Sequence, residues 1–302
     1  MKSSPESRAL NWLKASQRED GGVLASPNQK NKIYPYTEIT GYYTKVCLMY
    51  DEDDYATRSA NYIVNLNNNG FLSWDGNEDI AYVFDTMICA DALLDMWEYS
   101  YQEKYFNAAH QMVNRIKTIL DTLGHLPAMF DSKGSCWNNE NLYYTMPGAH
   151  YIKLMPIFER FDMSRSYLNG LMHLQRDDGA FHCHPKTRYV FSHFHAYALD
   201  GIEKYFPAEY EKGAAWAAKN LMPDGRVPAW SSDRSWSMPG ANIQCAYHLH
   251  NIGMEYEADL LMKTVYEDQL EDGSIPIRTG GESETWPTIF LLMYNRDVID
   301  NC

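Results

Sequence analysis

Six acidic and imidazole side chains occur beside or inside apolar stretches of the chain: Glu38, Asp79, Asp85, His193, His195 and Glu284. Asp85 is the most informative of them. It lies within the apolar run IAYVFDTMICADALLDMW (residues 80–97), where an unpaired charge would be costly. It must therefore have a partner or face a cavity. Two carboxyl groups brought together could serve as general acid and base at a glycosidic bond.

Acidic residues at helix starts also have a structural explanation, because they cap the helix or oppose its dipole. Glu38, Asp79 and Glu284 fit that explanation as well as a catalytic one. The stretch at 51–54 formally matches a D-x-D-D acid motif. It precedes a predicted helix at a turn, so we interpret it as a solvated helix start.

The densest ionisable cluster is HCHPKTRYVFSHFH at residues 182–195. His193 and His195 are two residues apart and cannot share one helix face, although one of them could act as a general base or bind a substrate hydroxyl. The spacing of His182, Cys183 and His184 matches no familiar zinc pattern, so we predict no metal. For each histidine alone, a structural hydrogen bond is the competing explanation.

Aromatic and basic residues flank the same segments. Tyr and Trp faces can stack on sugar rings, and arginine can hold a sugar carboxylate. The predicted substrate-binding residues are Tyr34, Tyr36, Tyr42, Trp74, Trp137, Tyr143, Tyr144, His150, Arg188, Trp230, Arg234, Trp236, Arg278 and Trp286. Hydrolysis would use a carboxylate pair. Lyase or epimerase chemistry would use Tyr or His to move a proton beside a carboxylate held by Arg188, Arg234 or Arg278.

An internal repeat predicts how these residues are positioned. The mark Q-x-x-D-G recurs at residues 17–21, 175–179 and 269–273, with weaker copies ending at Gly70, Gly124 and Gly225. The six glycines are spaced by 49, 54, 55, 46 and 48 residues, and six units of about 50 residues account for the whole chain. Glycine permits the positive φ that ends a helix.

The pattern predicts a helical hairpin in each unit. The segment 55–66 is amphipathic and fits an outer helix, whereas 80–97 is apolar nearly all round and fits an inner helix. No period-2 alternation persists, which disfavours strands. We therefore predict an all-α fold, an (α/α)6 toroid of six hairpins forming a single domain over residues 1–302. The loops after the glycines would lead into the inner helices and line a central bowl.

Composition excludes several partners. The net charge of −14 argues against nucleic acid and anionic membranes. The six scattered cysteines, without a CxxC, suggest reduced thiols in a cytoplasmic protein. We find no leader, membrane-spanning or cofactor-binding signature and expect no cofactor and no membrane insertion. The predicted partner is a small-molecule or oligosaccharide substrate, and the sequence leaves the oligomeric state open.

The repeat marks resemble those of the α/α-toroid superfamily. Its members include terpene cyclases and protein prenyltransferases with Q-x-x-D-G-x-W repeats, and (α/α)6 glycan-active hydrolases, lyases and epimerases. The segments YPYTEITGY (34–42) and YVFDT (82–86) look like motifs of toroids encoded near bacterial polysaccharide genes. That resemblance implies a role in sugar chemistry. The aromatic residue of the repeat motif is missing from two of the three marks, and Phe181 comes closest to it.

Three functions follow as hypotheses. The first is a carbohydrate-active enzyme (a glycoside hydrolase, polysaccharide lyase or sugar epimerase) acting on a glycan in the bowl. The second is a glycan- or protein-binding toroid without catalysis, since a fold does not fix a function. The third is an isoprenoid cyclase or transferase, which would need an apolar cavity with one acid at its floor.

Overall fold

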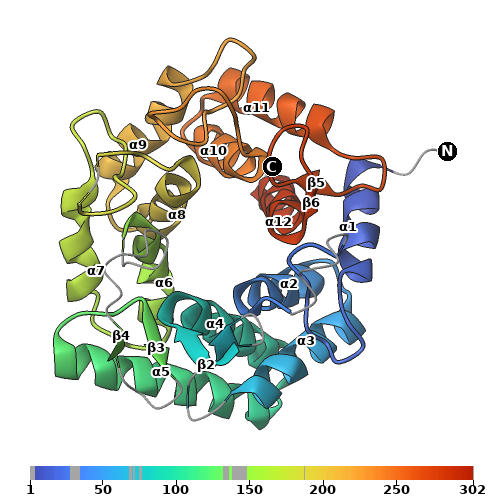
Figure 1. Ribbon diagram of the computed structural model, residues 1–302, viewed down its shortest axis with the longest axis vertical. Helices are drawn as coiled ribbons and strands as arrows, with labels where there is room; N and C mark the ends of the chain where they lie inside the picture. Colours follow the sequence, from blue (N-terminus) through green and yellow to red (C-terminus); the bar gives the residue numbers. More distant parts are fainter. Residues whose placement is uncertain are drawn as a thin grey trace. The chain divides into compact units, whose positions relative to one another are not determined.

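Twelve α-helices, two 3₁₀ helices and six short strands make up the residues that the computed structural model describes, which are 4–27, 35–67, 70, 72–74, 77–131, 136–137, 148–186 and 188–301 (Figure 1). The helices are α1 (Pro5–Ala15), α2 (Thr37–Met49), α3 (Asp53–Leu66), α4 (Val83–Ser100), α5 (Glu103–Leu123), α6 (Met155–Arg160), α7 (Ser166–Gly170), α8 (Ser192–Ile202), α9 (Pro207–Lys219), α10 (Pro239–Asn251), α11 (Glu255–Asp268) and α12 (Thr285–Asn301). The 3₁₀ helices are η1 (Ala149–Leu154) and η2 (Leu171–Leu174). The strands are β1 (Ser73–Trp74), β2 (Asn77–Tyr82), β3 (Met129–Asp131), β4 (Cys136–Trp137), β5 (Ile275–Pro276) and β6 (Ser283–Glu284).

The helices form pairs in which one helix is buried and the other is half-exposed. This arrangement confirms the predicted all-α hairpin architecture. In α4 every residue from Val83 to Leu94 is buried, as in an inner helix. Its partner α5 is an outer helix that buries one face, at Tyr105, Ala108, Ala109, Met112, Val113, Ile116 and Ile119. This spacing of three or four residues is the amphipathic pattern of a helix packed on one side. The inner helices are α2, α4, η1, α8, α10 and α12.

The chain forms two compact units, and each has its own interior. The first unit contains 14–147 and 157–167, with α2 packed on α3 and α4, and α4 packed on α5. The second unit contains 1–13, 148–156 and 168–302, where α8 packs on η1, and α10 packs on α11 and α12 (Figure 1). The single domain over 1–302 stays a prediction.

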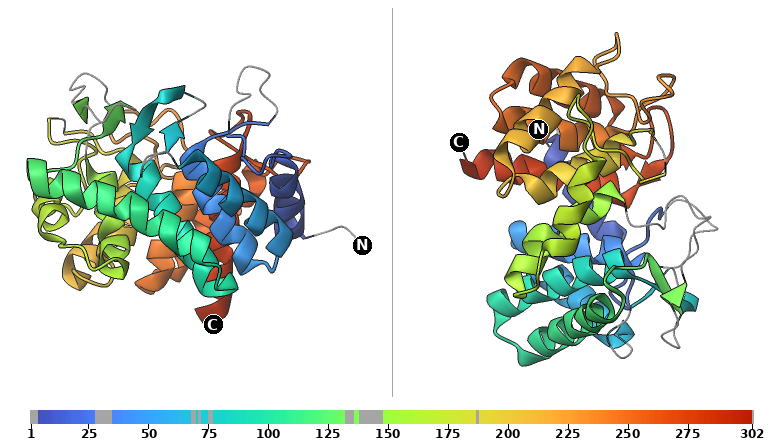
Figure 2. Two further views of the ribbon diagram at one scale, coloured as in Figure 1. Left: turned by 90° about the horizontal axis from the view of Figure 1, so that it is seen from below. Right: turned by 90° about the vertical axis from the view of Figure 1, so that its left-hand side faces the viewer.

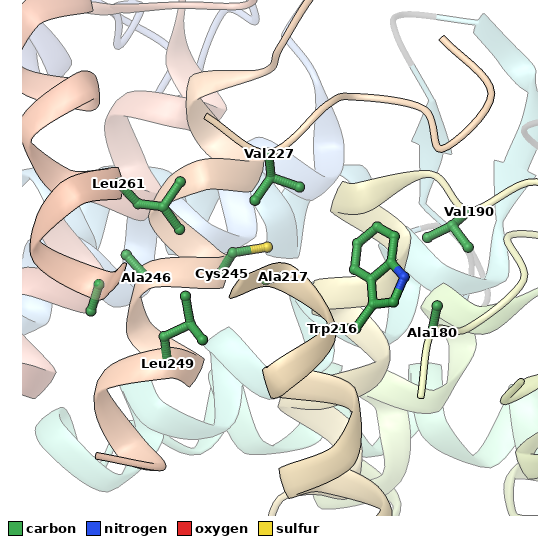
Figure 3. Close-up of a cluster of buried hydrophobic side chains, with 10 residues drawn as sticks. Ala180, Val190, Trp216, Ala217, Val227, Cys245, Ala246, Leu249 and Leu261 are labelled. Atoms are coloured by element: carbon green, nitrogen blue, oxygen red, sulfur yellow. The ribbon is translucent and has the colours of Figure 1, made fainter. Parts of the chain in front are cut away.

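The second unit shows how one such interior is filled. Trp216 of α9 packs with Cys245 and Leu249 of α10 and Leu261 of α11, beneath Val227 of the connecting loop (Figure 3). All five side chains are buried. Each buried side chain of this size stabilises the fold by about 1.5–3 kcal/mol through the hydrophobic effect.

The six repeat glycines adopt the backbone conformation that their spacing predicts. All have positive φ, between 70° at Gly124 and 97° at Gly21, Gly179 and Gly273. A Cβ on Gly179 would lie 2.3 Å from the carbonyl oxygen of Lys212 in α9, and a Cβ on Gly273 would lie 2.5 Å from that of Arg8 in α1. These loops therefore press backbone to backbone on an outer helix, and only glycine fits.

The Gln and the Asp that recur in the repeat mark make the same hydrogen bonds in each full copy. In the three full marks the Gln side chain donates to the carbonyl of its own mark's glycine and to a carbonyl in the first turn of an outer helix. The Asp side chain accepts the N–H two residues later, for example that of Ala180 at Asp178 and that of Ser274 at Asp272. Each mark thus closes a turn and docks it on a helix.

A second recurring bond fixes each loop to its inner helix. The fourth residue of the inner helix accepts the N–H that lies two positions after the repeat glycine. The four pairs are Val23 to Thr40 (3.2 Å), Phe181 to His195 (3.2 Å), Val227 to Asn242 (3.1 Å) and Ile275 to Thr288 (2.9 Å). This anchor sets where the first turn of each inner helix stands relative to its loop.

Two departures from the predicted hairpins occur. A four-stranded antiparallel sheet, ordered β1-β2-β3-β4, occupies the loop ends of the first unit, and β2 runs directly into α4 (Figure 2). The inner helix predicted to start near residue 80 therefore starts at Val83. In the third repeat, η1 replaces a long helix because Pro156 has no N–H to offer the carbonyl of Ile152.

No helix among the described residues is long and apolar enough to cross a bilayer.

Candidate active site

The first turns of α2 and α4 bring Glu38 and Asp85 close together in the first unit. The two helices approach tightly because Gly41 has no side chain, and a Cβ there would lie 3.2 Å from the Cys89 sulfur. The Cys89 thiol also donates to the carbonyl oxygen of Thr37, over 3.2 Å. Glu38 is half-buried, whereas Asp85 is only 5% exposed.

The surroundings of Asp85 favour its protonated form. Burial raises the pKa of this carboxyl well above its usual range, and the charge of Glu38 raises it further. Its Oδ2 atom is buried and makes no hydrogen bond with a described residue. The neighbouring Tyr82 keeps its proton as well, since burial and Asp85 raise its pKa to about 12. A carboxylic acid that keeps its proton at neutral pH can act as a general acid.

An ion cluster one to two turns further along fixes the two helices against each other. Asp91 of α4, 6% exposed, contacts Lys45 of α2 and lies 2.5 Å from the Arg160 guanidinium of α6. Asp95 of α4 joins both cations, at 3.1 Å from Lys45 and 2.6 Å from Arg160. Burial raises the pKa of Asp91, but Lys45 and Arg160 outweigh it and hold that pKa below its usual value. The cluster sets the register at which Glu38 and Asp85 meet.

The second unit presents a different set at the start of α8. His193 is the second residue of this helix and is 9% exposed, and its Nδ1 lies 2.6 Å from Oε1 of Gln244 in α10. Its ring packs against Tyr197 and against Trp286 of α12, with centroids at 4.2 and 4.6 Å. Phe191 and Trp230 stack beside it with centroids 4.4 Å apart.

His195 has a structural role. Its Nδ1 accepts the Phe181 N–H, and its Nε2 donates to the carbonyl of Gly213 over 3.1 Å. It holds the position that Thr40, Asn242 and Thr288 hold in other repeats, where the side chain anchors the loop. Both ring nitrogens of His195 are hydrogen-bonded to the backbone, so we do not include His195 among the proposed catalytic residues.

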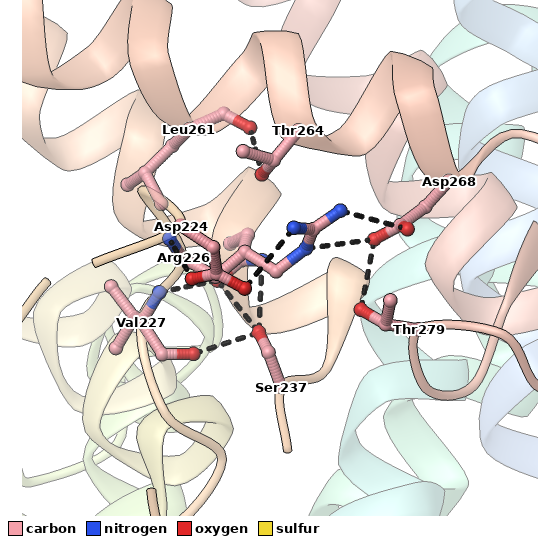
Figure 4. Close-up of polar contacts among 9 residues, drawn as sticks. Asp224, Arg226, Val227, Ser237, Leu261, Thr264, Asp268 and Thr279 are labelled. Atoms are coloured by element: carbon pink, nitrogen blue, oxygen red, sulfur yellow. Dashed lines mark hydrogen bonds and ion pairs between the residues drawn. The ribbon is translucent and has the colours of Figure 1, made fainter. Parts of the chain in front are cut away.

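The arginines expected to hold a sugar carboxylate are all exposed in the second unit. Arg234 is exposed and donates to the carbonyls of Asn220 and Leu221 at the end of α9. Arg188 and Arg278 are exposed as well. In the fifth loop Arg226 is paired with Asp268 and Asp224 (Figure 4).

The other predicted residues fall into three groups. Glu284, His150 and Tyr42 are buried, at 4%, 6% and 3% exposure, and the His150 ring packs 4.3 Å from that of Phe194. Tyr36, Trp230, Trp236 and Trp286 are half-buried near inner-helix starts. Tyr34, Tyr143 and Tyr144 lie outside the described residues, and so do the side chains of Trp74, Asp79 and Trp137. Within the described part of the chain, no three His, Cys, Asp or Glu side chains are placed to hold a metal ion.

The sequence analysis assigned no role to two residues beside His193, which are Gln244 and Gly240. Gln244 carries no signal beyond being a polar residue in an apolar helix. Gly240 is the second residue of α10, the position of Glu38 in α2, His193 in α8 and Trp286 in α12. A Cβ on Gly240 would lie 2.4 Å from the Trp286 ring, so this glycine lets Trp286 cross α10 toward His193. Aligning the inner helices by their loop anchors would have revealed it.

Comparison with solved structures identifies the fold. The chain is similar to an α-amylase from Clostridium perfringens (TM-score 0.75, 13% identity, 97% of each chain). It is similar to a sugar epimerase from a ruminal bacterium (TM-score 0.74, 11% identity, 96% of each chain). A type II terpene cyclase from Scytonema also matches (TM-score 0.69, 12% identity, 99% of this chain and 97% of that chain).

These matches cover nearly the whole chain, so it has the α/α-toroid fold. No protein-family model matches the sequence, and no curated protein matches it.

Proposed function

We propose that this protein is a carbohydrate-active enzyme in which Asp85 donates a proton to a glycosidic oxygen and Glu38 is the partner carboxylate. The observation that carries the proposal is the buried Asp85 carboxyl, whose Oδ2 atom has no hydrogen-bond partner among the described residues and whose pKa is raised by burial and by Glu38. A buried acid with a raised pKa and an unpaired oxygen is typical of a functional site.

The pair suits acid-assisted cleavage of a glycosidic bond. Asp85 transfers its proton to the leaving oxygen as the bond from that oxygen to the anomeric carbon breaks. The negative charge of Glu38 then stabilises the positive charge that develops on the sugar ring, or accepts a proton from an attacking water. As the proton leaves Asp85, the two carboxylates come to repel each other, which favours its return after each turnover.

Two further observations concern the reaction and the substrate. Elimination beside a sugar carboxylate needs a cation to hold that carboxylate, and Arg234, one of the three arginines predicted for this role, already donates to the carbonyls at the end of α9. The similar folds of an α-amylase and a sugar epimerase make a sugar substrate the natural one to test first.

A thermal-shift screen against neutral and acidic oligosaccharides, followed by product analysis, tests the proposal. A ligand that binds the native state raises the melting temperature with occupancy. We expect wild type and Asp85→Asn to be stabilised by the same oligosaccharide, and Asp85→Asn to lose at least about 100-fold in turnover. The matched control is Asp54→Asn on the exposed start of α3, which we expect to keep full activity. Turnover that survives in Asp85→Asn would refute the assignment.

Isoprenoid cyclisation is the second candidate, because a single protonated carboxyl among apolar side chains of α4 also suits protonation of an alkene. The similarity to a terpene cyclase favours including it. Prenyl diphosphates in the same screen distinguish the two candidates. Turnover of a prenyl diphosphate, and of no sugar, would favour isoprenoid cyclisation over sugar hydrolysis. Saturable sugar binding that produces no product would instead indicate a binding protein.

A further inference from the structure

The contact between His193 and Gln244 determines which nitrogen of the imidazole carries its proton. Gln244 is fully buried, and its Oε1 atom lies 2.6 Å from His193 Nδ1. An amide oxygen only accepts hydrogen bonds, so in this orientation of the amide the proton is on Nδ1. His193 Nε2 then carries a lone pair and has no partner among the described residues.

The surroundings of Gln244 select that orientation of its amide. Tyr294 of α12 donates its hydroxyl proton to Asp200, with oxygen–oxygen distances of 2.8 and 3.0 Å. Burial and Asp200 raise the pKa of Tyr294, and the Gln244 side chain acts in the opposite direction, as an amide N–H directed toward the phenol oxygen does. Gln244 Nε2 makes no hydrogen bond with a described residue, so the preferred orientation follows from the proximity of the amide to the phenol. A reversed amide would set two oxygens, neither with a free proton, against each other.

His193 is also kept neutral. Burial lowers its pKa to about 4, and the charged groups that act on it, Lys153 of η1 and Asp200 of its own helix, have opposite signs. Those two groups pair with each other at 2.5 Å, so they nearly cancel. His150 of η1, which also faces this imidazole, is neutral as well because burial lowers its pKa to about 3.

The His193 ring lies among aromatic side chains. Trp286 contacts it across the backbone of Gly240, with ring centroids 4.6 Å apart, and Tyr197 packs against it with centroids 4.2 Å apart. A neutral lone pair beside an indole attracts a hydroxyl group, which can donate a proton. It repels a carboxylate, which has none to donate.

We propose that Gln244 holds His193 as its Nδ1–H tautomer, so that Nε2 accepts a hydrogen bond from a hydroxyl of an uncharged sugar beside Trp286. Nε2 thereby favours a hydroxyl over a carboxylate at the sugar carbon beside it, so a neutral sugar binds better than the uronic acid that carries its carboxylate at that carbon. This inference rests on the proposed sugar substrate, and it names the class of sugar and Gln244 as a positioning residue.

Long-range proton–nitrogen NMR of histidine-labelled protein tests the tautomer without any sugar, with His193→Gln to assign the signals. We expect a protonated Nδ1 and a bare Nε2 at neutral pH. In Gln244→Glu the new carboxylate favours the doubly protonated ring, so Nε2 gains a proton. A bare Nδ1 in wild type would overturn the inference.

Binding of glucose and glucuronic acid, measured by titration calorimetry, tests the selectivity. We expect wild type to prefer glucose and Gln244→Glu to shift the ratio of the two affinities by about tenfold toward glucuronic acid, the value of one hydrogen bond. The matched control Gln102→Glu, exposed before α5, should leave the ratio unchanged. Should the buried glutamate prevent folding, Gln244→Met removes the acceptor without charge and should populate the Nε2–H form.

An unchanged ratio in a folded Gln244 variant, or no binding of either sugar, would overturn the inference. The proposed function fails by a different result, which is turnover surviving in Asp85→Asn.

Discussion

The repeat glycines offer a graded test of how the fold is held together. Three glycine-to-alanine changes differ in one physical respect each. Gly179 has φ +97° and its Cβ would lie 2.3 Å from the Lys212 carbonyl oxygen. Gly124 has φ +70° and nothing within 4 Å. Gly170 ends α7 with φ −61° and also has nothing within 4 Å.

The expected costs follow from those differences. Gly124→Ala meets only the backbone strain of the left-handed region, about 1–2 kcal/mol. Gly179→Ala adds a backbone clash that neither segment can relieve by a side-chain rotation, about another 1–3 kcal/mol, for a total of about 2–5 kcal/mol. Gly170→Ala removes unfolded-state freedom at a helical φ and should stabilise by about 0.5 kcal/mol.

Urea unfolding at pH 7, followed by circular dichroism, measures all three variants against wild type. The urea midpoints should decrease in the order Gly170→Ala, wild type, Gly124→Ala, Gly179→Ala. The slope of the unfolding free energy against urea concentration should be the same for all four proteins. If Gly179→Ala costs no more than Gly124→Ala, the loop does not press on α9, and the docking role of the repeat mark is refuted.

Three further predictions concern stability and the assignment of roles. Asp91→Asn leaves Lys45 without its buried partner and should cost about 3 kcal/mol in urea unfolding. Because the pKa of Asp91 is held below its usual value, its contribution is present above about pH 4 and lost as the pH falls further, so the cost of the change should shrink at pH 3. His195→Asn, which copies Asn242, should retain more stability than His195→Leu and leave sugar turnover unchanged; lost turnover in the folded Asn variant would restore His195 to the catalytic set. Differential scanning calorimetry should show one unfolding transition for residues 1–302, and two separate transitions would contradict the single-domain prediction.

The fold was predictable from the sequence because the repeat leaves marks that only a particular backbone requires. A glycine needed for positive φ, and a Gln and Asp that close the same turn, recur regardless of what surrounds them. The strands β1–β4 were not predictable, since they are two to six residues long and carry no sustained alternation. The break at η1 depended on one proline within an otherwise helical pattern.

The site was predictable only where a residue type conflicts with its surroundings. Asp85 stood out as an acid in an apolar helix, and the structure adds what the sequence could not, which is its proximity to Glu38. His193 and His195 looked alike in sequence, because the partners that separate them, Gln244 and Gly213, lie 51 and 18 residues away. The role of Arg188, Arg234 and Arg278 stays a prediction, and their exposure could not be predicted because it depends on tertiary contacts.

The most direct test of the central claim is infrared difference spectroscopy of wild type against Asp85→Asn, recorded from pH 5 to pH 9. Because burial and Glu38 raise the pKa of Asp85, its protonated-carboxyl band should persist at pH 7 and disappear only as the pH rises further. The band should be absent from Asp85→Asn at every pH, and turnover should fall on the alkaline side in step with it. An ionised Asp85 at pH 7 in an active enzyme would contradict the assignment of this residue as the proton donor.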